Sequence, residues 1–174
     1  MKSASCLHRT LLTLLGAVVV LTTFACGGAP SSGASSGASA STSSGESAAE
    51  RCLANASAKR ERKPSEPARI TAKHVLVKYA GAKRAPETVT RTREQACLRA
   101  EEALTKLKDG MSFAEVVRVY SEESGAETRE GTIGTIERSD VAAAFADAAF
   151  ELMPGEVSEV VETKFGFHVI LRVE

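Results

Sequence analysis

Apolar and polar positions follow two different rhythms along the chain, and these rhythms predict its elements. Between residues 92 and 150, apolar side chains recur every three or four positions, which is the period of helices with one buried face. Short runs rich in valine and isoleucine indicate strands at 70–78, 131–136, 157–161 and 167–173. The order strand, helix, helix, strand, helix, strand, strand predicts an α+β domain with a small, largely antiparallel sheet.

Capping signals predict where the helices begin. The motifs TREQ (92–95) and SFAE (112–115) both fit a capping box, in which the hydroxyl of the first residue and the side chain of the fourth each accept a backbone N–H. Gly110 should end the first of these helices. Ser139 or Asp140 is expected to cap a third helix.

The first 25 residues have the pattern of an export signal. Lys2 and Arg9 provide positive charge, and residues 11–24 form an apolar stretch. This stretch is too short to favour a permanent transmembrane helix, although an uncleaved anchor remains the alternative. We therefore predict a signal peptide over residues 1–25.

A linker is predicted to follow the signal and to cover residues 26–68. Residues 27–49 are nearly all glycine, serine, alanine and threonine, a composition that cannot bury a core and behaves as a flexible tether. Residues 50–67 are charged and contain two prolines, so we expect a solvated connector there. The folded domain is predicted to occupy residues 69–174.

Charge excludes a general attraction to nucleic acid. Lysine plus arginine and aspartate plus glutamate both number 22, so the formal net charge is zero. No metal site or cofactor is expected, because only two histidines remain beyond the signal and neither has a metal-ligand spacing to a cysteine or another histidine. The sequence contains no evident dimerisation helix, so we expect a monomer.

The four cysteines have different expected fates. Cys6 would leave with the signal. The segment LTTFAC, which ends at Cys26, resembles a bacterial lipobox, which implies that Cys26 is acylated. Cys52 and Cys97 could form a disulfide in an oxidising compartment, or Cys52 could be a free thiol in the linker and Cys97 a half-buried helix residue. The sequence leaves these two possibilities equal.

Four sequence blocks in the predicted domain resemble, in order, those of the parvulin family of peptidyl-prolyl cis–trans isomerases. The blocks are KHVLVK (73–78), GMSFAE (110–115), FADAAF with the following PGEVS (145–158), and TKFGFHVI (163–170). The resemblance implies an FKBP-like α+β fold, with a four-stranded antiparallel sheet and about four helices. It also implies that the domain catalyses rotation of the peptide bond before proline.

The chemistry of that reaction defines what the site must provide. Rotation about an X–Pro bond faces a barrier of about 20 kcal/mol, because amide resonance must be broken. No covalent bond changes, so the reaction requires neither a nucleophile nor a metal. The catalyst needs an apolar slot for the proline ring, exclusion of water and a polar wall beside the twisted amide.

By resemblance, the site residues fall into two groups. The polar wall would consist of catalytic residues His74, Glu123, Thr163 and His168. The substrate-binding slot would be lined by Ile133, Val141, Phe145 and Phe150. The two histidines could act on the amide directly or hold the shape of the site, and both roles remain open.

This sequence departs from the family pattern at three positions. Val141 replaces the usual methionine or leucine, which should widen the slot. Glu123, in the string SEES (121–124), occupies the position of a cysteine or aspartate beside the substrate carbonyl. Glu130 resembles a one-residue insertion before Gly131, so the Glu123 side chain could sit differently.

A basic loop follows the first predicted strand. Lys78, Lys83 and Arg84 resemble the basic cluster of the phosphorylation-directed parvulins, which implies binding of an anion just before the substrate proline. A merely solvated basic loop is the alternative. Acidic residues are the expected ligand more than phosphorylated ones, since phosphorylated clients are uncommon outside the cytoplasm.

We expect a prolyl isomerase that acts on proline-containing segments of exported proteins. Cys26 would tether it by lipid to the bacterial cell envelope, on the periplasmic side of the outer membrane if the cell has two membranes. The alternative function is a non-catalytic periplasmic chaperone or assembly module that uses the same groove.

Overall fold

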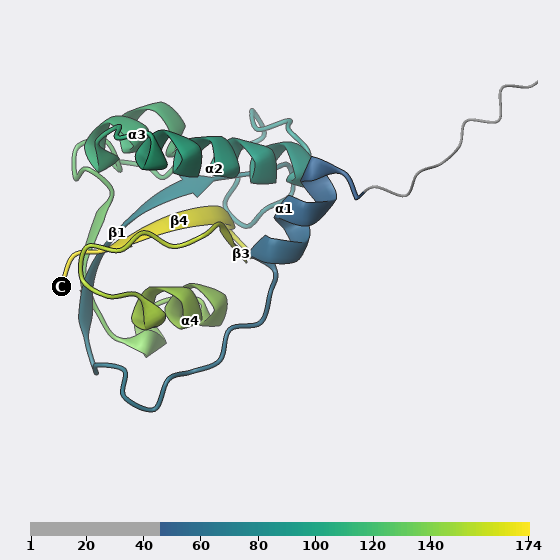
Figure 1. Cartoon of the computed structure of the whole chain (residues 1–174). Coiled ribbons are helices and arrows are strands. Elements are labelled where there is room, and N and C mark those ends of the chain that lie inside the picture. The colour runs from purple at the N-terminus through teal and green to yellow at the C-terminus, as the bar shows by residue number, and fades with distance from the viewer. Residues whose placement is uncertain (1–45) are drawn as a thin grey trace, which may run out of the picture. The chain divides into compact units, whose positions relative to one another are not determined.

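The computed structural model describes residues 46–174 (Figure 1). The predicted signal peptide, the acylation site at Cys26 and the tether up to residue 45 lie outside the described residues. Within residues 46–174, no helix combines the length and apolar character needed to cross a membrane.

The centre of the fold is a four-stranded antiparallel sheet, as the sequence predicted. Its strands are β1 (Ile70–Val77), β2 (Thr132–Ile136), β3 (Val161–Thr163) and β4 (Gly166–Arg172), in the spatial order β2-β1-β4-β3. The two longest strands, β1 and β4, are therefore central neighbours.

Helices cover both faces of this sheet (Figure 1). The helices α1 (Ala48–Ala56), α2 (Arg93–Lys108) and α3 (Phe113–Tyr120) lie on one face, and α4 (Ala143–Glu151) lies on the other. The predicted capping boxes of α2 and α3 are confirmed: Thr92 accepts from the Gln95 N–H, and Ser112 accepts from the Glu115 N–H. Gly110 follows the end of α2, as predicted.

Alternation along the central strands produces two cores. Val75 and Val169 pack in the core beneath α2 and α3, whereas Ala72 and Ile170 pack in the core beneath α4. Successive side chains of a strand point to opposite faces, so each strand supplies both cores. This alternation also fixes the face on which the histidines of β1 and β4 lie.

The predicted cap of the third helix is wrong. Residues Arg138–Asp140 form a short 3-10 turn, and α4 begins only at Ala143, after Ala142, which provides no side-chain cap. The Asp140 carboxylate instead accepts the Glu137 N–H at 2.8 Å and closes the turn before α4. The same side chain cannot cap a helix that starts three residues later.

The strand predicted at 157–161 is also displaced. Val157 makes only an isolated bridge with Leu171, and the strand begins at Val161. Ser158 explains the interruption, because its hydroxyl accepts the Ile170 N–H at 2.9 Å in place of a backbone carbonyl. A side chain that takes over a ladder hydrogen bond ends the regular pairing.

Part of the predicted flexible linker is folded. Ser47 and Glu50 form a capping box that starts α1, and Cys52 and Ala56 of this helix are buried in the core. A disulfide joins Cys52 to Cys97 of α2, with their Cα atoms 6.0 Å apart. The part of the predicted linker that forms α1 therefore belongs to the domain, because its buried side chains and the cross-link attach it there.

The connector between α1 and β1 is held against α4 by charged side chains. Lys63 donates from Nζ to the Glu151 carbonyl oxygen at 3.0 Å. Arg138 contacts both the Glu66 carboxylate of the connector and Asp147 of α4. The charges that predicted a solvated segment thus fasten it to the helix that closes one face of the sheet.

The disulfide should provide a measurable part of the stability. It closes a loop with a sequence separation of 45 residues. Restricting such a loop in the unfolded chain is expected to contribute about 4 kcal/mol. We expect the double substitution Cys52→Ala and Cys97→Ala to lower the free energy of unfolding by about that amount in urea titrations. Reductant should destabilise the wild type and leave the double variant unchanged; an unchanged wild-type midpoint would contradict the prediction.

Candidate active site

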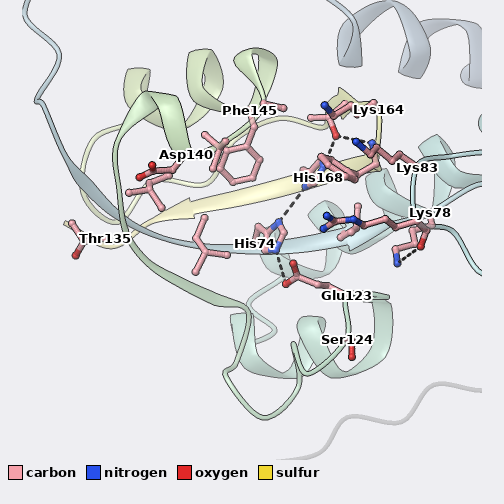
Figure 2. Close-up of a pocket in the computed structure, with 18 residues that line it drawn as sticks. His74, Lys78, Lys83, Glu123, Ser124, Thr135, Asp140, Phe145, Lys164 and His168 are labelled. Atoms are coloured by element: carbon pink, nitrogen blue, oxygen red, sulfur yellow. Dashed lines mark hydrogen bonds and ion pairs between the residues drawn. The ribbon is translucent and has the colours of Figure 1, made fainter.

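A groove lies between the sheet face that carries β1 and β4 and the start of α4 (Figure 2). Its volume is about 1010 Å³. The structure brings together ten of the eleven predicted site residues along its walls: His74, Lys78, Lys83, Arg84, Glu123, Ile133, Val141, Phe145, Thr163 and His168. Segments far apart in the sequence therefore converge on a single groove.

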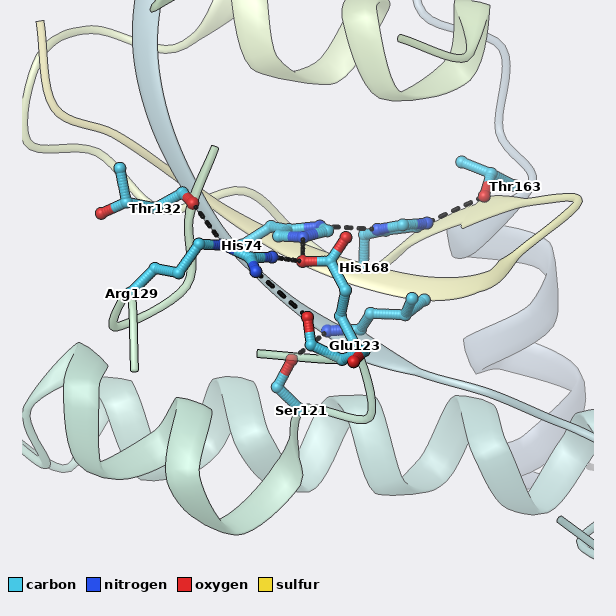
Figure 3. Close-up of polar contacts among 9 residues, drawn as sticks. His74, Ser121, Glu123, Arg129, Thr132, Thr163 and His168 are labelled. Atoms are coloured by element: carbon cyan, nitrogen blue, oxygen red, sulfur yellow. Dashed lines mark hydrogen bonds and ion pairs between the residues drawn. The ribbon is translucent and has the colours of Figure 1, made fainter. Parts of the chain in front are cut away.

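A chain of hydrogen bonds crosses the groove (Figure 3). The Thr163 hydroxyl lies 2.8 Å from His168 Nε2. The Nδ1 atoms of His168 and His74 are 3.1 Å apart, and His74 Nε2 lies 3.0 Å from Glu123 Oε2. Both nitrogens of each ring therefore have a partner, which is the requirement for burying a histidine.

Strand register places the two histidines side by side. His74 pairs with Ile170 across the β1–β4 ladder, so His168 is its diagonal neighbour on the same face. The rings are nearly parallel, with an interplanar angle of 15° and centroids 5.3 Å apart. Phe145 meets both rings edge-on, at 5.7 Å from His74 and 5.3 Å from His168. The phenyl ring thereby seals the histidine pair from the α4 side.

Two members of this hydrogen-bonded series, His168 and Glu123, have pKa values below their usual range. Burial, together with the neighbouring His74, holds the pKa of His168 well below its usual value, so this ring is neutral at pH 7. The hydrogen bond from His74 holds the pKa of Glu123 below its usual value, and Arg129 adds to this effect. An ionised carboxylate only accepts, so His74 donates to it from Nε2.

The Thr163 hydroxyl sets the order of donors along this series. Where it donates to His168 Nε2, His168 donates from Nδ1–H to Nδ1 of His74. The Thr163 oxygen accepts the Phe165 N–H at 3.1 Å and keeps its own proton available for His168. In this order the polar wall is a series of donors that ends on the Glu123 carboxylate.

The apolar slot lies beside the histidine pair. Ile133 of β2, Val141 before α4 and Phe145 of α4 line it, and Leu76 and Ala142 also face the groove. Neither of the last two was predicted.

Phe150 does not line the groove. It is five residues beyond Phe145, which turns it about 140° around the helix. Its side chain is buried in the core beneath α4, 5.4 Å from the Arg138 guanidinium. We therefore assign Phe150 to packing, not to the slot.

Cations gather at one end of the groove. Lys78, Lys83 and Arg84 are joined there by Lys164 (Figure 2), which sequence reasoning missed although it directly follows Thr163. The Phe165 ring lies beneath three of these charges, 5.8 Å from Lys83 and Arg84 and 5.4 Å from Lys164. Aromatic faces attract cations at such distances, so the ring collects the basic side chains on one spot.

The backbone also joins the basic loop to the β3–β4 turn. The Lys83 N–H donates to the Lys164 carbonyl oxygen at 2.8 Å, and Lys78 Nζ donates to the Arg84 carbonyl oxygen at 3.1 Å. These bonds hold the basic end of the groove in a defined arrangement. Among residues 46–174, no group of three or more histidine, cysteine or acidic side chains is arranged to hold a metal ion.

Comparison with known proteins finds one matching family and many relatives. The family model of the PPIC-type PPIase domain matches residues 56–174. Peptidyl-prolyl cis-trans isomerase pin1 of Schizosaccharomyces pombe is 37% identical over 108 residues, and Foldase protein PrsA of Halalkalibacterium halodurans is 42% identical over 72 residues. These matches cover 60% and 41% of this chain, respectively.

The chain spans only part of these relatives, 62% of the length of pin1 and 22% of PrsA. Among solved structures, peptidyl-prolyl isomerase ESS1 from Candida albicans superposes with a TM-score of 0.57 at 26% identity. That match covers 62% of this chain and 63% of the other. It supports the same arrangement of sheet and helices.

The buried His168 should make stability depend on pH. Its folded pKa lies below its unfolded value of about 6.5, so the unfolded chain takes up a proton that the folded chain does not. This contribution is fully present above about pH 6.5 and is lost as pH falls toward the folded pKa, at up to about 1.4 kcal/mol per pH unit. We expect His168→Gln to show a shallower fall in unfolding free energy between about pH 6.5 and 5; equal slopes for the two proteins would refute this assignment.

Proposed function

This chain belongs to the PPIC-type, or parvulin, family of peptidyl-prolyl isomerases, and on that premise we propose that it catalyses cis–trans rotation of the bond before proline in polypeptides. The observation that carries the proposal is the convergence of His74, Thr163, His168 and Phe145 on one groove. These positions belong to different strands and to a helix, and packing alone does not require them to share a cavity.

The groove has the two halves that amide rotation needs. A planar amide is more dipolar than a twisted one, so removing water from it and seating the proline ring among apolar side chains favours the twisted state. Ile133, Val141 and Phe145 offer that apolar half. The histidine pair offers a fixed polar wall whose hydrogen-bonding groups are already satisfied and need not reorganise during the reaction.

Glu123 supports the polar wall from one end. Its carboxylate holds the Nε2 proton of His74, and its side chain remains one-third exposed at the groove. Loss of this acceptor leaves a buried ring nitrogen without a partner, which disturbs the orientation of both histidines.

The basic end suggests a preference for an acidic residue before proline. Lys78, Lys83, Arg84 and Lys164 line the groove next to Thr163 and His168, so an anionic side chain that precedes the bound proline would meet them. Each charge-assisted contact is expected to contribute on the order of 1 kcal/mol. Carboxylates and phosphorylated side chains share this chemistry.

We place the protein, by proposal, in an exported and lipid-anchored setting. The signal-like residues 1–25 and Cys26 support this location. The Cys52–Cys97 disulfide fits an oxidising compartment, where such bonds persist. The similarity to Foldase protein PrsA supports clients that are still folding, and unaided isomerisation is slow enough to limit folding.

Removal of the Glu123 carboxylate should slow catalysis. We expect Glu123→Ala to lower kcat/KM about tenfold, equivalent to about 1.4 kcal/mol of transition-state stabilisation. The measurement is a protease-coupled or NMR isomerisation assay with an Ala-Pro peptide. Glu127→Ala, an exposed change in the same loop, serves as the control. Wild-type rates in Glu123→Ala would remove this residue from the site.

Exchange NMR on short X–Pro peptides tests the function and the preference together. We expect Glu-Pro and phosphoSer-Pro peptides to isomerise faster than Ala-Pro, with the advantage greatest at low salt. The double substitution Lys83→Gln and Arg84→Gln should reduce that advantage roughly thirtyfold and leave Ala-Pro rates unchanged, since two contacts of about 1 kcal/mol each are lost.

The outcomes separate the alternatives. Equal isomerisation rates for all residues X would show that the basic end does not select substrates, and they would still support the isomerase activity. Binding of proline peptides without any acceleration of exchange would instead favour the non-catalytic chaperone.

A further inference from the structure

Arg129 lies on the loop that carries Glu123 toward β2, and its guanidinium contacts this loop at three points (Figure 3). Nη2 contacts Glu123 Oε2. Nη1 donates to the Ser124 carbonyl oxygen at 3.0 Å, and Nε donates to the Thr132 carbonyl oxygen at 3.2 Å. All three nitrogens are thus used, two on the backbone at the ends of the loop and one on the carboxylate.

We propose that Arg129 is a positioning residue of the isomerase site, which clamps the Glu123 carboxylate against His74 and so fixes the ring nitrogen from which His74 donates. The inference rests on the proposed function and adds to it a residue that neither the sequence blocks nor the groove lining identifies. Arg129 acts on the reaction only through Glu123.

The length of the Glu123 side chain explains why its carboxylate needs a second contact to hold its position. A glutamate has one more rotatable bond than an aspartate, so its carboxylate needs a second contact to keep one orientation. His74 Nε2 and Arg129 Nη2 converge on the same oxygen, Glu123 Oε2. An arginine side chain never gives up its charge in proteins and never accepts a hydrogen bond, so it keeps this oxygen anionic and leaves His74 as the other donor.

The backbone around the loop sets the position of the clamp relative to His74. The His74 N–H donates to the Gly131 carbonyl oxygen at 2.9 Å. A Cβ on Gly131 would lie 2.6 Å from the His74 carbonyl oxygen, so only glycine allows this approach. Glu130, just before it, has a φ of 51° and pairs with Lys73 at 3.1 Å. Glu130 and Gly131, both with positive φ, therefore form the turn that follows Arg129 and leads into β2.

Two donor groups face the Glu123 carboxylate. His74 comes from β1 and Arg129 from the loop, and both lower the pKa of Glu123. Glu122 turns to the opposite side, where it accepts from the Lys78 N–H and from Arg91. His168 lies behind His74, so it reaches Glu123 only through that ring. Removing Arg129 should therefore raise the pKa of Glu123 and loosen its hold on His74.

The test compares Arg129→Ala and Arg129→Lys with the wild type in the full chain. We expect Arg129→Ala to lower kcat/KM about fivefold or more and to move the acid limb of the pH–kcat/KM profile to higher pH. Arg129→Lys should restore the acid limb, because it restores the charge, but only part of the rate, because one amine cannot serve three acceptors. Nitrogen-15 NMR of the imidazoles should show a single His74 tautomer with Nε2 protonated in the wild type and a mixture in Arg129→Ala.

Two controls isolate the effect. Glu130→Gln removes the negative charge that pairs with Lys73 in the same loop without reaching Glu123, and it should leave the pH profile and the tautomer unchanged. In a Glu123→Ala background, Arg129→Ala should cause no further loss of kcat/KM if it acts through Glu123.

The results distinguish this proposal from the proposed function. An unchanged tautomer and acid limb in Arg129→Ala, or losses that multiply in the double variant, would overturn the positioning role even if the rate falls. The NMR tautomer needs no turnover, so a protein without isomerase activity would contradict the proposed function and still report on the clamp.

Discussion

The structure of the site depends on the burial of two imidazole rings against each other between strands and helix. A buried polar ring is costly unless both nitrogens have partners. His74 and His168 satisfy one another at one nitrogen each, and the remaining two require Thr163 and Glu123. The register of β1 with β4, the turn that presents Thr163 and the loop that presents Glu123 must therefore all form together. A single requirement for hydrogen-bond satisfaction thus links four separate parts of the chain.

Much of this could be predicted from the sequence, because the signals were local. Valine-rich runs gave the central strands, and two capping boxes gave α2 and α3, since both patterns act within a few residues. Family resemblance supplied the distant site positions that local rules cannot join. The prediction that Phe150 lines the slot was wrong, because a residue on the same helix as Phe145 need not lie on the same face of that helix. The predicted start of α4 was wrong because the Asp140 side chain could accept a backbone N–H either from the following helix or from the turn before it. Only the tertiary structure selects between these two partners.

Other features were beyond the reach of pattern analysis for a different physical reason. The charges of residues 50–67 predicted a solvated connector, yet the Glu66 side chain is nearly buried beneath Arg138. Arg138 lies 72 residues away in the sequence, so no local pattern reveals the contact. Arg129 and Lys164 were overlooked because a charged loop residue gives no periodic signal. The disulfide was one of two possibilities that the sequence left open for Cys52 and Cys97. Its formation depends on α1, which has its own capping box and its own buried side chains.

The two layers that enclose the sheet differ in how their helices are attached. On the α2 side, a disulfide joins α1 to α2 through Cys52 and Cys97, in addition to the buried core. On the α4 side, Phe145 and Phe150 pack in a second buried core, and Arg138 adds ion pairs to Glu66 and Asp147. Ion pairs weaken with salt where they are exposed, whereas a disulfide does not. The covalent cross-link therefore lies in the layer behind the two histidine strands, opposite the groove wall that carries Phe145.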